Sequence, residues 1–175
     1  GENYIIYWAT TITGKFPESQ IELDKGYNHR IYYTLTKDFE NFTPSKLLFE
    51  PGFNVIDATI QKIKDGYLMI YKNETRKPIA KNLNIAIAKN LTGPYQPIGN
   101  PITDNYWAEG PSLFKVKDKW IIVFDKYIEK EFGAIQSKDL RNWKDISEEI
   151  SFPKGARHGS ILKISIEIFE ELTTN

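Results

Sequence analysis

The sequence predicts an all-β protein built from repeated small sheets, and three observations carry this prediction. Short apolar runs alternate with turn-forming clusters along most of the chain. A phrase of seven or eight residues recurs at a spacing of about fifty residues. Aromatic residues, which favour strands, make up 14% of the chain. Helical spacing is found only at 166–172, where a short terminal helix competes with a final strand.

Nine runs qualify as strands. In chain order they are 4–9, 30–34, 55–60, 67–71, 83–88, 111–116, 120–124, 133–136 and 160–164. The clusters Lys-Asp-Gly at 64–66, Thr-Gly-Pro at 92–94 and Lys-Asp-Lys at 117–119 are typical of tight turns. Short runs joined by such turns predict several small sheets.

The recurring phrase follows a strand in three places. It reads Thr-Lys-Asp-Phe-Glu-Asn-Phe at 36–42, Ala-Lys-Asn-Leu-Thr-Gly-Pro-Tyr at 88–95 and Ser-Lys-Asp-Leu-Arg-Asn-Trp at 137–143. Its lysines, Lys37, Lys89 and Lys138, are 52 and then 49 residues apart. A period near fifty residues with several strands per unit is typical of the blades of a β-propeller.

The repeat divides the chain into five parts. These are the outer part of one blade over 1–50, whole blades over 51–102 and 103–152, the inner strand of another blade over 153–165, and a tail over 166–175. Propellers close with at least about four blades. We therefore expect that this chain is an incomplete part of a propeller, and that further blades lie upstream of it.

Charge and composition exclude several classes of partner. Lys+Arg and Asp+Glu both number 23, so the formal net charge is zero and gives no support to a nucleic-acid or anionic-membrane partner. The chain has no cysteine, which excludes disulfides and thiolate metal sites. No apolar run approaches the roughly 18 residues of a membrane span. We expect neither nucleic acid nor membrane as a partner.

Three polar residues fall at equivalent points of the repeat. Asp57, Glu109 and His158 are separated by 52 and 49 residues, and each precedes a run that we expect to be the innermost strand of a blade. Innermost strands surround the central channel of a propeller, so these side chains should converge there. The alternatives are surface-loop carboxylates for the two acids. For His158 they are an ion ligand, a partner for a sugar hydroxyl, or a tie between strands.

This constellation suits glycoside hydrolysis. The reaction uses a protonated carboxylic acid beside the leaving oxygen and an ionised carboxylate opposite, roughly 6.5–9.5 Å away in inverting enzymes. Glu109, flanked by Trp107 and Gly110-Pro111, suits the acid. Asp57 suits a neighbouring charge that raises the pKa of Glu109 and orients it. His29 lies in a polar loop at 27–30 that could reach a pocket.

The chain resembles glycoside hydrolase family 43. The most specific stretches are 27–33 (Tyr-Asn-His-Arg-Ile-Tyr-Tyr), 53–58 (Phe-Asn-Val-Ile-Asp-Ala), 106–111 (Tyr-Trp-Ala-Glu-Gly-Pro), 124–127 (Phe-Asp-Lys-Tyr) and 154–159 (Lys-Gly-Ala-Arg-His-Gly). The resemblance implies a five-bladed β-propeller that acts with inversion on carbohydrates containing arabinose, xylose or galactose. It also implies secretion or a periplasmic location.

The resemblance also implies roles for individual residues. Glu109 corresponds to the general acid, Asp57 to the residue that tunes the acid, and His158 to a channel position that holds an ion, possibly calcium, or a water. No cofactor is required. Substrate-binding roles are expected for Trp107, Lys126, Arg157, His158 and His29. The general base of the family is an Asp in the first blade, and no segment here matches it, so we expect the base on a missing N-terminal segment.

Two other functions stay open. A carbohydrate-binding propeller remnant would keep the aromatic residues and the polar pocket without a base. A related glycoside phosphorylase would need a cluster of Arg, Lys and His around the channel, of which Arg157 and His158 supply part.

Overall fold

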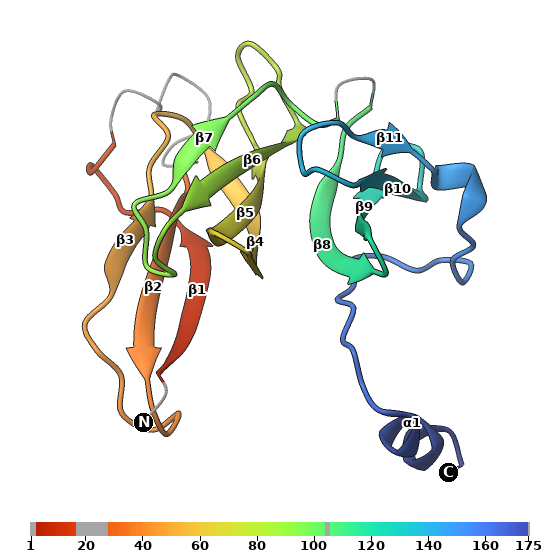
Figure 1. Cartoon of the computed structure of the whole chain (residues 1–175). Coiled ribbons are helices and arrows are strands. Elements are labelled where there is room, and N and C mark those ends of the chain that lie inside the picture. The colour runs from red at the N-terminus through yellow and green to blue at the C-terminus, as the bar shows by residue number, and fades with distance from the viewer. Residues whose placement is uncertain (1–2, 17–27, 104–105, 175) are drawn as a thin grey trace.

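The structure, a computed structural model, describes residues 3–16, 28–103 and 106–174. Within these ranges the chain is all-β apart from one 3-10 turn, Ser147–Glu149, and one α-helix, α1 (Ile166–Thr173). The strands form three antiparallel sheets, which lie side by side in chain order in Figure 1. The prediction of an all-β protein is therefore confirmed. Tyr27, part of the polar loop around His29, lies outside the described residues.

The first sheet has three strands in the order β1-β2-β3. They are β1 (Tyr4–Thr10), β2 (Arg30–Thr36) and β3 (Lys46–Phe49). Strand β1 pairs with β2 along its whole length, from Tyr4 opposite Thr36 to Thr10 opposite Arg30. Every residue of β2 except Leu35 is buried, as expected for the central strand of a sheet covered on both faces.

The other two sheets have four strands each, and within each sheet the spatial order follows the chain. The second sheet contains β4 (Val55–Ile63), β5 (Gly66–Asn73), β6 (Asn82–Ala88) and β7 (Gln96–Ile98). The third contains β8 (Glu109–Val116), β9 (Lys119–Lys126), β10 (Glu131–Ser137) and β11 (Lys144–Asp145). Strands β4 and β8, the first of each sheet, contact one another directly.

Strand β5 explains how the three sheets hold together. Its side chains point alternately to opposite faces. Met69 and Tyr71 pack into a core shared with the first sheet, against residues such as Ile31 and Phe49. Leu68 and Ile70 pack into a second core, which the third sheet completes with its own apolar residues. The unbroken apolar run of β5 is thus the pattern of a strand buried on both faces, and each such side chain contributes about 1.5–3 kcal/mol by leaving water.

The recurring phrase forms the same turn in two of its three copies. The Thr36 hydroxyl accepts hydrogen bonds from the N–H groups of Asp38 and Phe39, and the Ser137 hydroxyl does the same for Asp139 and Leu140. In each copy the Asp carboxylate then accepts two backbone N–H groups and the amide of the following Asn. The middle residues, Phe39 and Leu140, have φ of 59° and 62°. The repeat is therefore structural as well as sequential.

Three features differ from the predicted elements. The expected inner strand at 160–164 is wrong, because this stretch is irregular and exposed and pairs with no described strand. A strand without a neighbour leaves its backbone hydrogen bonds unmade. The short strands β3, β7 and β11 were not expected, since two to four residues carry too little alternation to be recognised. The short terminal helix is confirmed as α1, and a competing final strand is not formed.

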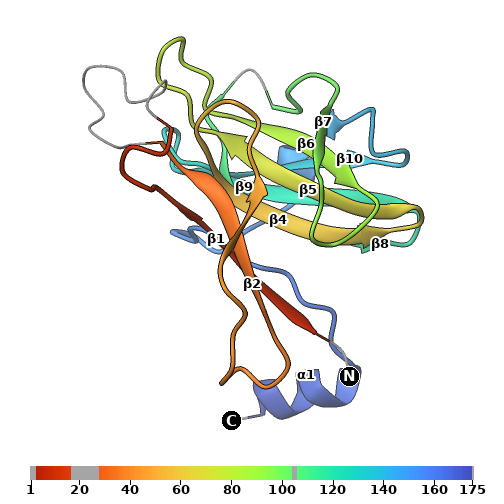
Figure 2. The same ribbon diagram turned by 90° about the vertical axis from the view of Figure 1, so that its left-hand side faces the viewer.

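Helix α1 hangs away from the sheets at the end of the irregular segment (Figure 1), and Figure 2 shows the same arrangement from the side. Ser165 caps it by accepting the N–H of Ile168. The helix has eight residues. None of the described helices is long and apolar enough to cross a membrane.

Candidate active site

Glu109 is the first residue of β8 and lies at a β-bulge. It pairs with Asp125 of β9, and the register shifts between Glu109 and Ser112. The extra residue is accommodated by Gly110, whose φ of 56° is in the left-handed region. The N–H of Gly110 donates to Oδ2 of Asp57 at 3.1 Å. Asp57 therefore fixes the backbone that aims the Glu109 side chain.

Two cations hold the Glu109 carboxylate. Its Oε2 atom lies 2.9 Å from Nζ of Lys72, and its Oε1 atom lies 2.9 Å from Nε2 of His158. Lys72 is on β5, in the neighbouring sheet, and its side chain is only 2% exposed. Glu109 itself is 19% exposed, so one edge of its carboxylate stays open to a ligand.

These contacts set the charge of Glu109. Burial alone would raise its pKa, but the hydrogen bonds and charges of Lys72 and His158 outweigh burial, and the pKa lies below the ordinary value of 4.5. Burial would likewise lower the pKa of Lys72, but Glu74 and Glu109 raise it above its usual range. The expectation of a raised pKa at Glu109 is therefore wrong for this arrangement, because a buried lysine, invisible in the local sequence, reaches the carboxylate.

Asp57 does not occupy the position equivalent to Glu109. In the second sheet Ile56 pairs with Lys72 and the register shifts before Thr59. In the third sheet Glu109 pairs with Asp125 and the register shifts before Ser112. Asp57, with φ of 51°, is thus equivalent to Gly110 and not to Glu109. The alignment of Asp57 with Glu109 is wrong by one residue, although the two lie next to each other in space through Gly110.

Asp125 provides a second carboxylate beside Glu109. It is fully buried, and its Oδ2 atom lies 2.5 Å from Nε of Arg157 and 3.6 Å from Nε2 of His158. Oδ1 of Asp125 is one of a few buried polar atoms of the described residues without a hydrogen bond. Arg157 and His158 therefore reach the site through contacts with both acids, as expected.

The residues around His158 do not fit a calcium ion. Among the described residues, one oxygen each from Glu109 and Asp125 and one nitrogen of His158 lie within 4.8 Å of one another. Calcium takes six to eight oxygen ligands. Here the set offers a nitrogen and two carboxylates, which Lys72 and Arg157 already pair. No step of the chemistry below uses a metal.

The remaining predicted residues lie in different places. Trp107 lies two residues before Glu109, with its ring centroid 5.9 Å from that of Tyr127. Lys126 instead points to Tyr106, with Nζ 4.2 Å from the ring centroid, and to Asp145 at 3.9 Å. The N–H of His29 donates to Oδ1 of Asn54 at 2.8 Å, which links β2 to the start of β4. Neither of these last two contacts involves Glu109.

Sequence reasoning missed Lys72 and Asp125. Each directly follows the apolar run of the second strand of its sheet, and they are equivalent positions, 53 residues apart. A charged residue that continues a buried apolar run at the same point of two repeats is a signal for a buried functional charge. The signal was present, but it lay on the second strands and not on the first.

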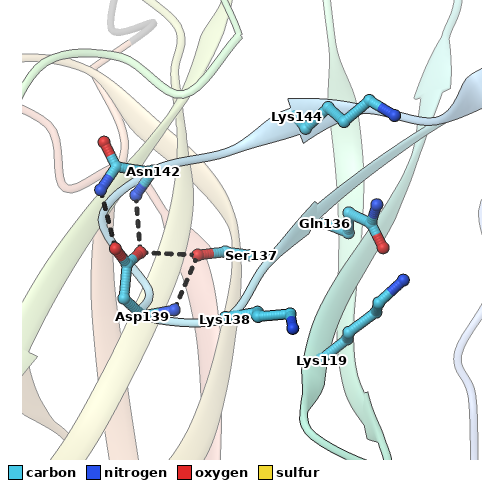
Figure 3. Close-up of a pocket in the computed structure, with 7 residues that line it drawn as sticks. All are labelled: Lys119, Gln136, Ser137, Lys138, Asp139, Asn142 and Lys144. Atoms are coloured by element: carbon cyan, nitrogen blue, oxygen red, sulfur yellow. Dashed lines mark hydrogen bonds between the residues drawn. The ribbon is translucent and has the colours of Figure 1, made fainter.

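Two pockets lie away from the mouth of this site or beside it. A cavity of about 360 Å³ is lined by Asp57, Ala58, Gly110, Pro111, His158, Gly159 and Ser160. Another of about 430 Å³ lies beside the repeated turn at 137–142 and has lysines around it (Figure 3). Lys138 and Lys144 of this second pocket pair with Asp118 and Glu149 at 3.1 and 3.3 Å. The first cavity is the one that adjoins Glu109.

Comparison with known families decides what this geometry belongs to. A family model described as a probable glycosyl hydrolase domain, of the group related to glycoside hydrolase family 43, matches residues 1–170. The chain belongs to this family. The resemblance to family 43 is confirmed.

Individual relatives agree with the family assignment of this family 43-related domain. An α-L-arabinofuranosidase from Bifidobacterium longum subsp. longum is 29% identical over 75 residues, which cover 41% of this chain and 7% of that protein. The structure of an α-L-arabinofuranosidase from Lactobacillus brevis matches with a TM-score of 0.57 and 17% identity over 83% of this chain. The structure of the β-xylosidase RS223 matches with a TM-score of 0.60 and 15% identity over 81% of it.

The match is partial on the side of the relatives. The family 43-related domain covers 51% of the Lactobacillus brevis enzyme and 53% of the β-xylosidase. It thus spans about half the length of these two structures. At such low identities the likeness shows a shared fold.

Proposed function

We propose that this chain carries the proton-donating side of an inverting glycoside hydrolase site, acting on carbohydrates that contain arabinose, xylose or galactose. The observation that carries the proposal is the position of Glu109. Its carboxylate is partly exposed at a bulge beside a cavity, and two cations and a buried acid surround it. Membership of a family related to glycoside hydrolase family 43 supports this reaction class.

The roles follow from the contacts. Glu109 is the general acid that protonates the leaving oxygen. Asp57 is a positioning residue, because it holds Gly110 and with it the direction of Glu109. His158 and Arg157 line the approach to the acid, and both are about half exposed.

The general base is proposed to lie outside this chain. Asp125 is a poor candidate, since its carboxylate oxygen lies within 4.8 Å of that of Glu109 and it is fully buried and paired with Arg157. An inverting pair stands roughly 6.5–9.5 Å apart to leave room for water. We propose that the three sheets are parts of a five-bladed propeller, with the base on an upstream blade. Secretion or a periplasmic location stays a prediction.

A low pKa at Glu109 has a consequence for activity. A general acid works in its protonated form, and the fraction in that form falls as pH rises above its pKa. We therefore expect kcat/KM to decrease with rising pH from an acidic optimum. Replacing Lys72 by Met removes the main cation and should move this decrease to higher pH, whereas a steric effect alone would leave the profile in place.

The decisive experiment compares two kinds of substrate. With Glu109→Gln, hydrolysis of arabino-, xylo- or galacto-oligosaccharides should fall by roughly 10²–10⁴-fold. A p-nitrophenyl glycoside should lose much less, because its leaving group needs little protonation. The assay uses this chain and any longer polypeptide that carries it. Equal losses on both substrates would contradict the role of Glu109 as the acid.

The two other functions give different outcomes in the same assay. A carbohydrate-binding protein would bind the oligosaccharides and hydrolyse neither kind of substrate. A phosphorylase would show turnover that depends on added phosphate. The cations near Glu109 favour the phosphorylase little, because Lys72 and Arg157 are already paired with carboxylates.

A further inference from the structure

A cavity of about 410 Å³ opens on the far side of Lys72 from Glu109. It is lined by Glu74, Arg76, Ile79, Lys81, Trp107 and Tyr127. Only Trp107 was expected at a binding site from the sequence. The cavity is formed where the loop between β5 and β6 meets the segment that leads into β8, and the N–H of Ala108 donates to the carbonyl of Lys81 at 3.0 Å. That hydrogen bond fixes the two walls against each other.

Two aromatic rings form one corner of the cavity. The ring centroids of Trp107 and Tyr127 are 5.9 Å apart, and the planes are inclined by 50°. Trp107 is 36% exposed, so a large part of its ring is free to contact a ligand. The flat apolar face of such a ring suits the C–H face of a sugar, and cavities that bind small molecules combine such walls with a few polar groups.

The polar groups of the cavity are charged but balanced. Glu74 is buried, and its carboxylate pairs with both Lys72, at 2.7 Å, and Lys81. These paired charges leave hydrogen-bonding groups and little net field at the floor. A neutral ligand with several hydroxyl groups fits such a lining better than a charged one.

Lys72 connects this cavity to the site of Glu109. Its Nζ atom lies 2.9 Å from Glu109, 2.7 Å from Glu74 and 4.5 Å from the centroid of the Tyr127 ring. The acid and the cavity are therefore separated by a single side chain. Lys72 holds both ends in fixed positions, because it is almost completely buried.

We propose that this cavity binds a neutral sugar unit of the substrate, next to the unit on which Glu109 acts, with Trp107 and Tyr127 as its apolar wall. The proposal rests on the proposed function, and it adds a second binding position to it. It makes Trp107 and Tyr127 determinants of affinity and of chain length. Neither takes part in proton transfer.

The test is a titration of the chain with neutral arabino-, xylo- and galacto-oligosaccharides of two to four units. Binding is followed by calorimetry and by the NMR signals of the tryptophan indole N–H groups. The signal of Trp107 should shift, and Trp107→Ala should weaken the affinity by about tenfold or more. Trp107→Phe, which keeps an aromatic wall, should recover most of the affinity. Phe42→Ala, at a similarly exposed ring in the turn after β2, is the matched control and should change nothing.

The outcomes separate this proposal from the proposed function. If oligosaccharides bind and are cleaved but Trp107→Ala keeps full affinity and the Trp107 signal does not move, the cavity proposal is wrong and the role of Glu109 stands. If Glu109→Gln keeps the affinity while Trp107→Ala loses it, the cavity proposal is supported. If no oligosaccharide binds or reacts, both proposals fail. The circular dichroism of each variant checks that it is folded.

Discussion

Strands β4 and β8 carry the same bulge but different side chains. In both, one residue pairs with the second strand of the sheet, the next has a positive φ, and pairing resumes at the third residue after the first. In β4 these residues are Ile56 and Asp57, opposite Lys72. In β8 they are Glu109 and Gly110, opposite Asp125. The shared backbone directs all of these positions to one place, and the differing side chains give that place its chemistry.

The comparison also shows how the two sheets depend on each other. Lys72 and Asp125 are equivalent residues of opposite charge, and both are buried. Lys72 pairs with Glu109 of the other sheet, and Asp57 accepts the N–H of Gly110 of the other sheet. Neither sheet holds a complete site. The interface between the first strands of the sheets makes it.

The largest expected effect comes from breaking the contact across this interface at Lys72. Lys72→Met leaves Glu109 with only His158 and Arg157 and leaves the buried Glu74 with only Lys81. Removing one partner of a buried ion pair is strongly destabilising, so the free energy of unfolding should fall by about 3 kcal/mol. Urea denaturation with an unchanged m-value measures it. Lys62→Met, at an exposed lysine of β4, is the control, and an equal loss there would contradict the prediction.

A second change tests the bulge itself. At Gly110 an added Cβ would lie 3.0 Å from the His158 ring, on a backbone with φ of 56°. Gly110→Ala should therefore destabilise the chain by about 2 kcal/mol. Gly99→Ala, with φ of 68° and nothing within 4 Å, isolates the backbone cost and should lose about 1 kcal/mol.

The matching outcome involves His158. If the ring causes the additional loss, His158→Ala should restore part of the stability in the Gly110→Ala background. Thermal unfolding of the four proteins, including the unchanged chain, gives the answer. A loss at Gly110 no larger than that at Gly99 would show that the histidine moves away freely.

A smaller effect concerns pH. The pKa of Glu109 in the folded chain lies below its ordinary value of 4.5, so the stabilisation that its charge provides is complete above pH 4.5 and is lost as the pH falls through the folded-state value. The difference in unfolding free energy between the chain and Glu109→Gln should be at most about 1 kcal/mol at pH 7 and should shrink at acidic pH. A difference that grows on acidification would mean that burial determines the pKa instead.

The smallest effect compares the two identical turns. The pKa values of Asp38 and Asp139 lie below their usual range, because each carboxylate accepts backbone N–H groups and the amide of the following Asn. Asp38→Ala and Asp139→Ala should lower Tm by similar amounts, about 2 °C or less, because both turns are exposed. The loss should disappear at acidic pH, where the carboxylates are protonated. Unequal changes measured by calorimetry would contradict the equivalence of the turns.

Local sequence determined most of the secondary structure. The apolar run of β5, the turn-forming clusters and the repeated phrase depend on residues close together in the chain, and the structure forms the expected strands there. The third copy of the phrase, at 88–95, is an instructive exception. There Asn90 and Gly93 replace the Asp and Asn of the other two, and the turn is closed by a bond from the Gly93 N–H to the Asn90 carbonyl.

The sequence also indicated that Glu109 and His158 come together, through the period of the repeat. Their side chains do meet, at 2.9 Å. The period could not give the exact phase, because a bulge adds one residue to a strand without leaving a mark in the apolar pattern. For this reason Asp57 falls opposite Gly110 and not opposite Glu109.

Only the tertiary structure decided the charge at the site and the shape of the second cavity. Lys72 reaches Glu109 across 37 residues of sequence and from another sheet. The electrostatic energy between two such groups depends on their distance in space and on the surrounding dielectric, and neither is encoded in any short segment. The same holds for the run at 160–164: its composition favours a strand, but a strand forms only where another offers its backbone for pairing.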